Sequence, residues 1–170
     1  GIQLAAYDQI KSALSKITPD DLLLLDPNKV AVGTLADIVV NVGFIEQTAP
    51  STFLKSVKSE ADVEHIREAM RQDGAALCEF FAEFEQRLNN GERLSELDVD
   101  SMLIAVRSQQ PNYVSPSFPT IAGFNENGAL PHYRATAEKF SYLDVKEGEG
   151  GLLLIDSGAQ YQNGTTDITR

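Results

Sequence analysis

The segment from residue 151 to residue 170 most constrains the fold of this chain. Four apolar residues, 152–155, lead directly into Asp156, and a polar stretch then leads to Asp167 and a second β-prone run. Short apolar runs bounded by turn residues are typical of strands. Two carboxylates on paired strands would supply hard oxygen ligands for divalent cations without a flexible loop. The segment therefore predicts a β-hairpin with a candidate metal site, and the rest of the chain must build the sheet around it.

The register of this hairpin decides whether its two acids meet. Asp156 and Asp167 oppose each other only if the turn is centred midway between them. The Asn163-Gly164 pair is a strong signal for a two-residue turn, and it lies beyond that midpoint. A turn there would pair Asp167 with Gln160 and leave Asp156 four residues further along its strand, roughly 13 Å away.

Two local irregularities would restore the pairing. One is a longer loop that ends with Gly164 in a left-handed conformation, and the other is a bulge at Ser157-Gly158. From the pattern alone, a metal site and a pair of acids flanking a surface turn both stay open.

Composition limits the class of partner and the compartment. The formal net charge of -11 and the pI of about 4.5 exclude nucleic acid and anionic membrane as expected partners, because like charges repel. The one cysteine, Cys78, excludes an internal disulfide, and its apolar neighbours predict a buried, inert thiol. With no signal peptide and no apolar run near 18 residues, we expect a cytoplasmic protein.

Residues 1–57 predict a small α/β unit. Apolar residues recur at helical spacing over 7–17, and the run of four leucines at 22–25 predicts a buried strand. A short helix is expected within 29–36 and a second β-prone stretch at 38–45. A polar segment at 47–52 marks a junction.

A long amphipathic helix is expected to begin after Ser59. Ser59 and Asp62 form a capping box, and the helix should end near residues 89–91. His65 is expected to lie at the surface. A solvated face is expected for the charged residues Glu64, Arg67, Glu68, Arg71, Glu79 and Glu83. The predicted buried stripe consists of Val63, Ile66, Met70, Leu77, Phe80 or Phe81, Phe84 and Leu88.

A second capping box, Ser95 with Asp98, opens a shorter helix that runs through Arg107. Its predicted buried side chains are Val99, Met102, Leu103 and Val106. Two helices stacked before a sheet predict an α+β fold.

Residues 111–133 are rich in proline and glycine and predict strand and constrained loop, a kind of backbone that often carries function. His132 lies there between Pro131 and Tyr133. A lone histidine is more often structural. If His132 is instead functional, it would act as a proton donor or hydrogen-bond donor beside the carboxylates.

Several motifs, taken together and in order, resemble one family. They are residues 117–121 (SFPTI), 127–129 (NGA) followed by His132-Tyr133, 156–161 (DSGAQY), and 164–170 (GTTDITR), with a helix around 73–78 (DGAALC). The segment 58–170 resembles the first half of the catalytic domain of aminopeptidase P, the Xaa-Pro aminopeptidases. Residues 1–57 are similar to the end of the preceding non-catalytic, creatinase-like α/β domain in the long three-domain form.

The resemblance implies a pita-bread fold and a dinuclear site for two divalent metal ions, usually Mn²⁺. Such a site activates water to cleave the bond between an N-terminal residue and a following proline, so the implied substrates are peptides with proline in the second position. Asp156 and Asp167 match two metal-binding aspartates of the family. His132 matches a histidine that contacts the substrate and stabilises the oxyanion or shuttles protons.

The resemblance also has departures and rivals. Arg134-Ala135 stands where the family often has proline, which puts the local loop in question. The family's other ligands, a histidine and two glutamates, lie beyond Arg170, so we expect this chain to be inactive alone and to form homo-oligomers through exposed strand edges. The alternatives are a non-catalytic pita-bread module that binds proteins or peptides, and prolidase, which cleaves dipeptides only. Creatinase, which works without metal, is disfavoured by the retained aspartates.

Overall fold

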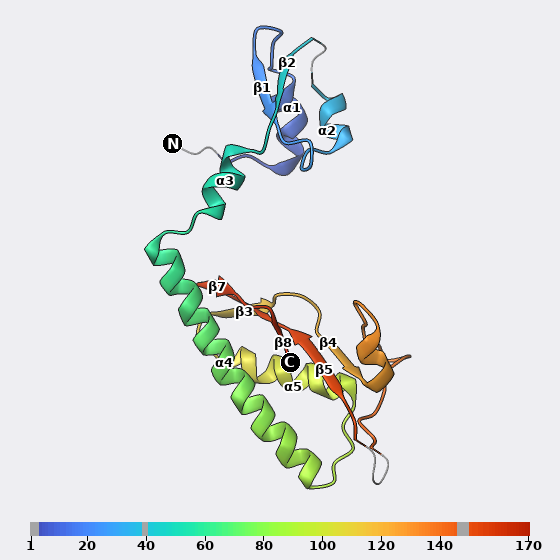
Figure 1. Cartoon of the computed structure of the whole chain (residues 1–170). Helices are drawn as coiled ribbons and strands as arrows, with labels where there is room; N and C mark the ends of the chain where they lie inside the picture. Colours follow the sequence, from blue (N-terminus) through green and yellow to red (C-terminus); the bar gives the residue numbers. More distant parts are fainter. Residues whose placement is uncertain (1–3, 39–40, 146–149) are drawn as a thin grey trace. The chain divides into compact units, whose positions relative to one another are not determined.

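The computed structural model describes residues 4–38, 41–145 and 150–170. By its internal contacts the chain divides into two compact units, Gly1–Lys58 and Ser59–Arg170 (Figure 1). Among the described helices, none combines the length and the apolar character that crossing a membrane requires.

The first unit contains short elements. A 3-10 turn, η1 (Tyr7–Gln9), leads into α1 (Ile10–Leu14), and β1 (Leu22–Leu25), α2 (Val32–Ala36), β2 (Gly43–Glu46) and α3 (Pro50–Ser56) follow. β1 and β2 pair in parallel, with Leu22 opposite Gly43.

The predicted strand at 22–25 is therefore present, but the prediction that it is buried is wrong. Its residues alternate between exposed and half-buried, because this described sheet has two strands only. The second strand begins at Gly43, later than predicted, and residues 39–40 of that prediction lie outside the described residues.

The second unit starts with two helices, α4 (Glu60–Asn89) and α5 (Glu96–Ser108). Both predicted capping boxes are present. The Ser59 and Ser95 hydroxyls accept hydrogen bonds from the backbone of Asp62 and Asp98, whose carboxylates accept from the backbone N–H of the two serines. These reciprocal bonds satisfy donors that a helix start leaves free, which explains why both helices begin where the sequence predicted.

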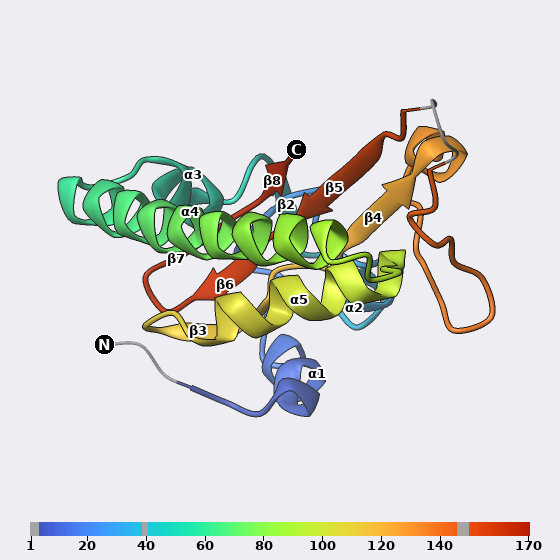
Figure 2. The ribbon, with the colours of Figure 1, turned by 90° about the horizontal axis from the view of Figure 1, so that it is seen from below.

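The strands of this unit form two three-stranded antiparallel sheets. Their order is β3-β6-β7 in one and β4-β5-β8 in the other. The elements are β3 (Tyr113–Pro116), β4 (Ile121–Phe124), the 3-10 helix η2 (Asn125–Ala129), β5 (Leu153–Ser157), β6 (Ala159–Tyr161), β7 (Gly164–Thr165) and β8 (Ile168–Thr169). The helices lie side by side against one face of the strands (Figure 2). This arrangement confirms the expected α+β class.

The main core lies between the helices and the β4-β5-β8 sheet. It joins Phe80 of α4 and Leu103 of α5 to Ala122, Ile155 and Ile168 of the three strands. All four residues predicted to be buried on α5 are buried.

The predicted stripe on α4 is partly wrong. Ile66, Met70 and Leu88 are exposed at 38%, 42% and 38%. The buried line instead runs through Ala69, Asp73, Ala76, Leu77 and Phe80. Small residues define part of this line because β7 comes very close: a Cβ built on Gly164 would lie 3.0 Å from the Cβ of Ala69.

The prediction of a buried Cys78 is wrong as well, since its side chain is exposed. Ala76 and Leu77 already face the core. The next residue of a helix is turned by about 100° around the axis, and here that turn takes the thiol to the solvent side.

Candidate metal centre

Both ladders of the C-terminal hairpin have the same pairing register. Asp156 pairs with Thr169 in the β5-β8 ladder, and Gln160 pairs with Thr165 in the β6-β7 ladder. Neither of the two registers considered for the sequence is observed: Asp167 pairs neither with Gln160, as an Asn-Gly turn would require, nor with Asp156, as direct opposition of the acids would require. The turn consists of Gln162 and Asn163, one residue earlier than the Asn-Gly signal indicated, because Gly164 is a strand residue that packs against α4.

The hairpin places both acids on its solvent side. Ile155, Ser157 and Ile168 are buried, whereas Asp156 is half-buried and Asp167 is exposed. This alternation puts the two acids on the face opposite the helices. Asp167 lies two residues before the partner of Asp156, and such diagonal neighbours in a regular ladder are roughly 7–8 Å apart.

The crossing between the two sheets depends on Gly158. A Cβ built there would lie only 2.0 Å from the Thr166 carbonyl oxygen. Thr166 pairs with Ala159 in an unusual way: its N–H donates to the Ala159 carbonyl, while its hydroxyl, instead of its carbonyl, accepts from the Ala159 N–H, both at 2.9 Å. The freed Thr166 carbonyl accepts from the Ser117 hydroxyl at 2.9 Å. The register shows no extra residue here, so the predicted bulge is absent.

Asp156 and His132 line one hollow of about 280 Å³, together with Thr169. The Thr169 hydroxyl donates to Asp156 Oδ1 at 3.0 Å and orients this carboxylate. Asp167 does not line the hollow, and its carboxylate makes no hydrogen bond or ion pair within the described part of the chain. The structure thus brings two of the three predicted site residues to one hollow and places the third on the same face.

His132 has an uncommon backbone conformation. Its φ of 57° is left-handed, which costs a residue other than glycine roughly 1–3 kcal/mol. The N–H of Tyr133 donates to the Leu130 carbonyl at 3.2 Å, so the chain forms a type II turn with Pro131 and His132 at its centre. The Pro-His pair is the sequence signal for this turn.

Glu96 is a buried residue that sequence reasoning missed. Its carboxylate accepts four hydrogen bonds, from the Phe124 and Ser141 backbone N–H groups, the Asn127 amide and the Tyr133 hydroxyl, at 2.7 to 2.9 Å. Burial alone would raise the pKa of Glu96, but the four donors together hold this pKa below its ordinary value. The same contact and burial raise the pKa of Tyr133 to about 12.

A second buried carboxylate, Asp73, joins both helices to the hairpin. Arg107 donates to both Asp73 oxygens, at 2.8 and 3.0 Å, and the Tyr161 hydroxyl donates to Oδ1 at 2.9 Å. Burial and the nearby Asp73 raise the pKa of Tyr161. Because Asp73 and Arg107 are almost completely buried, this pair fixes β6 against α4 and α5.

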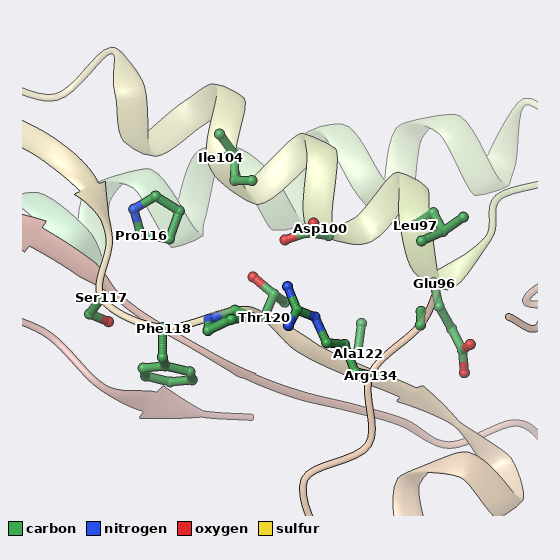
Figure 3. A pocket seen from close by; sticks show the side chains of 12 residues that line it. Glu96, Leu97, Asp100, Ile104, Pro116, Ser117, Phe118, Thr120, Ala122 and Arg134 are labelled. Atoms are coloured by element: carbon green, nitrogen blue, oxygen red, sulfur yellow. The ribbon is translucent and has the colours of Figure 1, made fainter. Parts of the chain in front are cut away.

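A separate hollow of about 480 Å³ lies between α5 and the segment that joins β3 to β4 (Figure 3). Asp100 and Arg134 lie on opposite sides of it. Glu96 borders the hollow, but its carboxylate is already used by its four donors. None of the three predicted site residues lines this hollow, so it is distinct from the candidate metal centre.

The donor chemistry of the exposed face fits part of a metal site. Asp156 and Asp167 offer the hard oxygen ligands that Mg²⁺, Ca²⁺ and Mn²⁺ prefer. Among residues 4–38, 41–145 and 150–170, no three histidine, cysteine or acidic side chains gather closely enough to hold a metal ion. The described residues therefore supply a partial ligand set.

Comparisons with known proteins identify relatives of this arrangement. Residues 64–170 match the model of metallopeptidase family M24. Aminopeptidase P2 of Arabidopsis thaliana is 30% identical over 199 aligned residues, which cover 100% of this chain and 28% of that protein. A probable Xaa-Pro aminopeptidase P of Ajellomyces capsulatus is 41% identical over 74% of this chain and 20% of that protein. The chain thus spans between 20% and 28% of the length of these relatives.

Solved structures match the fold. An X-prolyl aminopeptidase from Caenorhabditis elegans, described as a cytosolic enzyme with a di-nuclear active site, superposes with a TM-score of 0.78 at 28% identity, covering 96% of this chain and 27% of that one. The prolidase from Pyrococcus furiosus gives a TM-score of 0.69 at 22% identity, covering 99% of this chain and 48% of that one. At 22% identity, the similarity to the prolidase shows the fold alone. These matches confirm the expected pita-bread architecture.

Proposed function

Because this chain belongs to metallopeptidase family M24, we propose that it contributes part of the active site of an Xaa-Pro aminopeptidase. The substrates would be peptides with proline in the second position, and the reaction would be hydrolysis of the bond before that proline. The observation that carries the proposal is the placement of Asp156 and Asp167 on one exposed face in a single register, with His132 and Asp156 lining one hollow.

Asp156 and Asp167 would hold the metal, which we propose to be a pair of divalent cations, Mn²⁺ in the cell. When bound, such cations act as Lewis acids that polarise the scissile carbonyl and increase the acidity of water. Thr169 keeps one oxygen of Asp156 hydrogen-bonded, so that the carboxylate presents a fixed orientation.

His132 would serve the substrate side of the hollow. Its turn holds the imidazole on the rim shared with Asp156. From there it can donate a hydrogen bond to a developing oxyanion or transfer a proton to the leaving amine, two roles that an imidazole suits near neutral pH.

The two units have separate roles in this proposal. Residues 1–57 would be the end of a non-catalytic creatinase-like domain, and 58–170 the first half of the catalytic domain. The division of the chain after Lys58 supports this. A cytoplasmic location is part of the proposal, in line with the relative that is described as cytosolic.

Two carboxylates do not satisfy a dinuclear centre, whose ions need more ligands than the described residues bring together. We therefore expect the 170-residue chain to bind Mn²⁺ weakly and to show no turnover of an Xaa-Pro peptide. Calorimetric titration with Mn²⁺ tests the first point. Asp156→Asn and Asp167→Asn should each abolish the binding heat, and Asp144→Asn, which alters a surface ion pair with Arg93, should leave it unchanged. Equal binding in all variants would overturn the assignment of the ligands.

Substrate length separates this proposal from its enzymatic rival. A longer protein that carries this segment should cleave Xaa-Pro-Yaa tripeptides and longer peptides, and Asp156→Asn should remove that activity. Cleavage restricted to Xaa-Pro dipeptides would identify a prolidase, and metal-independent peptide binding without turnover would favour a non-catalytic binding module.

A further inference from the structure

The segment 127–133, whose last four residues form the turn that carries His132, is fastened at both ends to one buried carboxylate. Asn127, in η2, donates to Glu96 Oε1 at 2.9 Å, and Tyr133, at the end of the turn, donates to Glu96 Oε2 at 2.7 Å. Glu96 is fully buried at the first position of α5. It therefore ties this segment to the start of α5, while His132 itself is exposed.

The same carboxylate also holds the strand next to Asp156. Glu96 Oε1 accepts from the backbone N–H of Phe124, the last residue of β4. β4 pairs with β5 along its whole length, with Ile121 opposite Asp156. One side chain thus contacts both supports of the hollow: the turn that carries His132 and the strand that borders Asp156.

A left-handed histidine needs such support. The conformation is unfavourable for a residue with a Cβ, and it persists only where the surroundings over-determine it. The N–H of Tyr133 bonds within the turn, but the side chains of Asn127 and Tyr133 connect the turn to α5. A hydrogen bond to a buried charged group is stronger than one between neutral groups.

We propose that Glu96, acting through Tyr133 and Asn127, is the positioning residue that holds His132 at the rim of the hollow it shares with Asp156. Glu96 touches neither substrate nor metal, and its effect passes through the turn. The inference rests on the proposed function for the role of His132, but the geometry it invokes can be measured without metal or turnover.

The chain offers a matched pair of variants. Tyr133→Phe removes one hydroxyl that donates to a buried carboxylate, at 2.7 Å from Glu96. Tyr161→Phe removes the equivalent hydroxyl at 2.9 Å from Asp73, on the other side of the core. Both rings are buried, at 6% and 0% exposure, so each substitution removes a hydroxyl from the interior. The Tyr133 hydroxyl also accepts from the Asn127 amide at 3.1 Å, so Tyr133→Phe removes the contacts of the turn with both Glu96 and Asn127.

The readout is the NMR spectrum of the two histidines, His65 and His132. Tyr133→Phe should shift or broaden the His132 imidazole signals and speed amide hydrogen exchange of Leu130, His132 and Tyr133 by about tenfold or more, because the hydroxyl's bonds to Glu96 and Asn127 are both lost. The His65 signals should stay in place. Asn127→Ala, which frees the other end, should reproduce the His132 changes, while Tyr161→Phe should leave His132 unaltered.

Two results would overturn the inference. One is a His132 signal that does not change in Tyr133→Phe and Asn127→Ala, and the other is an equal change in Tyr161→Phe, which would indicate general loosening of the fold. Loss of Mn²⁺ binding or of peptidase activity plays no part in this test, so failure of the proposed function and failure of this inference can be told apart.

Discussion

Replacing Arg107 by Met should destabilise the second unit severely. The substitution keeps most of the apolar arm but removes the guanidinium that donates to both oxygens of Asp73. The side chains of Asp73 and Arg107 are 0% and 3% exposed, so bulk solvent does not reach the carboxylate to replace the lost donors. Only the Tyr161 hydroxyl would remain as a partner of the carboxylate.

The magnitude follows from this burial. Breaking a fully buried ion pair from one side typically costs about 3–5 kcal/mol, because an unpaired charge is left behind. Typical domains have only about 5–15 kcal/mol of stability. The matched control is Arg71→Met, which breaks an exposed pair with Glu68 at 2.7 Å and should cost no more than about 1 kcal/mol.

Urea unfolding followed by far-ultraviolet circular dichroism measures both free energies, since α4 and α5 dominate the helical signal. Adding Asp73→Leu to Arg107→Met should recover part of the loss, because the unpaired charge is then gone. A cost of Arg107→Met no larger than that of Arg71→Met, or a double variant less stable than Arg107→Met alone, would show that the Asp73–Arg107 pair does not stabilise the unit in this way.

Three further predictions concern the supports of the site. Gly158→Ala should destabilise the unit by roughly 1–3 kcal/mol, because the new methyl group overpacks against the Thr166 carbonyl. Gly74→Ala, inside α4 and with open space around it, should instead stabilise the helix by about 0.5–1 kcal/mol. Thermal unfolding compares the two variants, and the opposite order of stability would contradict the close approach at Gly158. The pKa of Glu96 is lower in the folded state, so the contribution of its carboxylate to stability is present above its ordinary pKa of 4.5 and is lost as pH falls through the folded value. Urea midpoints should therefore fall less steeply below pH 4.5 in Glu96→Gln than in the parent chain. The pKa of Tyr133 is raised from 10.0 to about 12, so the contribution of its neutral hydroxyl to stability is complete below pH 10 and is lost as pH rises toward 12. Ultraviolet titration of tyrosinate should show one group that ionises only as pH approaches 12, and Tyr133→Phe should remove that step.

The helical part of the second unit was predictable because local chemistry determines it. The capping boxes at Ser59 and Ser95 specify both helix starts through contacts within four residues. The stripe on α5 followed from simple apolar spacing. On α4 the prediction followed large side chains such as Ile66 and Met70, although the sheet packs on the small Ala69 and on Asp73.

The buried acids were missed for a related reason. An Asp or Glu on an amphipathic helix usually indicates a solvated face. Asp73, however, lies in phase with Ala69, Ala76 and Phe80, and Glu96 lies in phase with Val99 and Leu103. The position of each acid in phase with a buried stripe was the signal that the sequence offered. Their partners Asn127, Arg107 and Tyr161 lie 31 to 88 residues away along the chain, so no local pattern identifies these hydrogen bonds.

The hairpin shows the same limit. The sequence motifs identified Asp156 and Asp167, but their register depends on where Gly164 packs against α4. That contact is tertiary, so the Asn-Gly pair alone predicted the turn one residue too late. The shared face of the two acids follows from the observed register and from the alternation of buried and exposed residues.

Paramagnetic broadening by Mn²⁺ would show where on the hairpin the metal binds. As Mn²⁺ is titrated into the isotope-labelled chain, the amide signals next to Asp156 and Asp167 and the imidazole signal of His132 should weaken first, and Asp156→Asn should abolish this pattern. Broadening that begins instead at the acidic first turn of α4, or that spreads evenly over the chain, would contradict a metal site on this face of the hairpin.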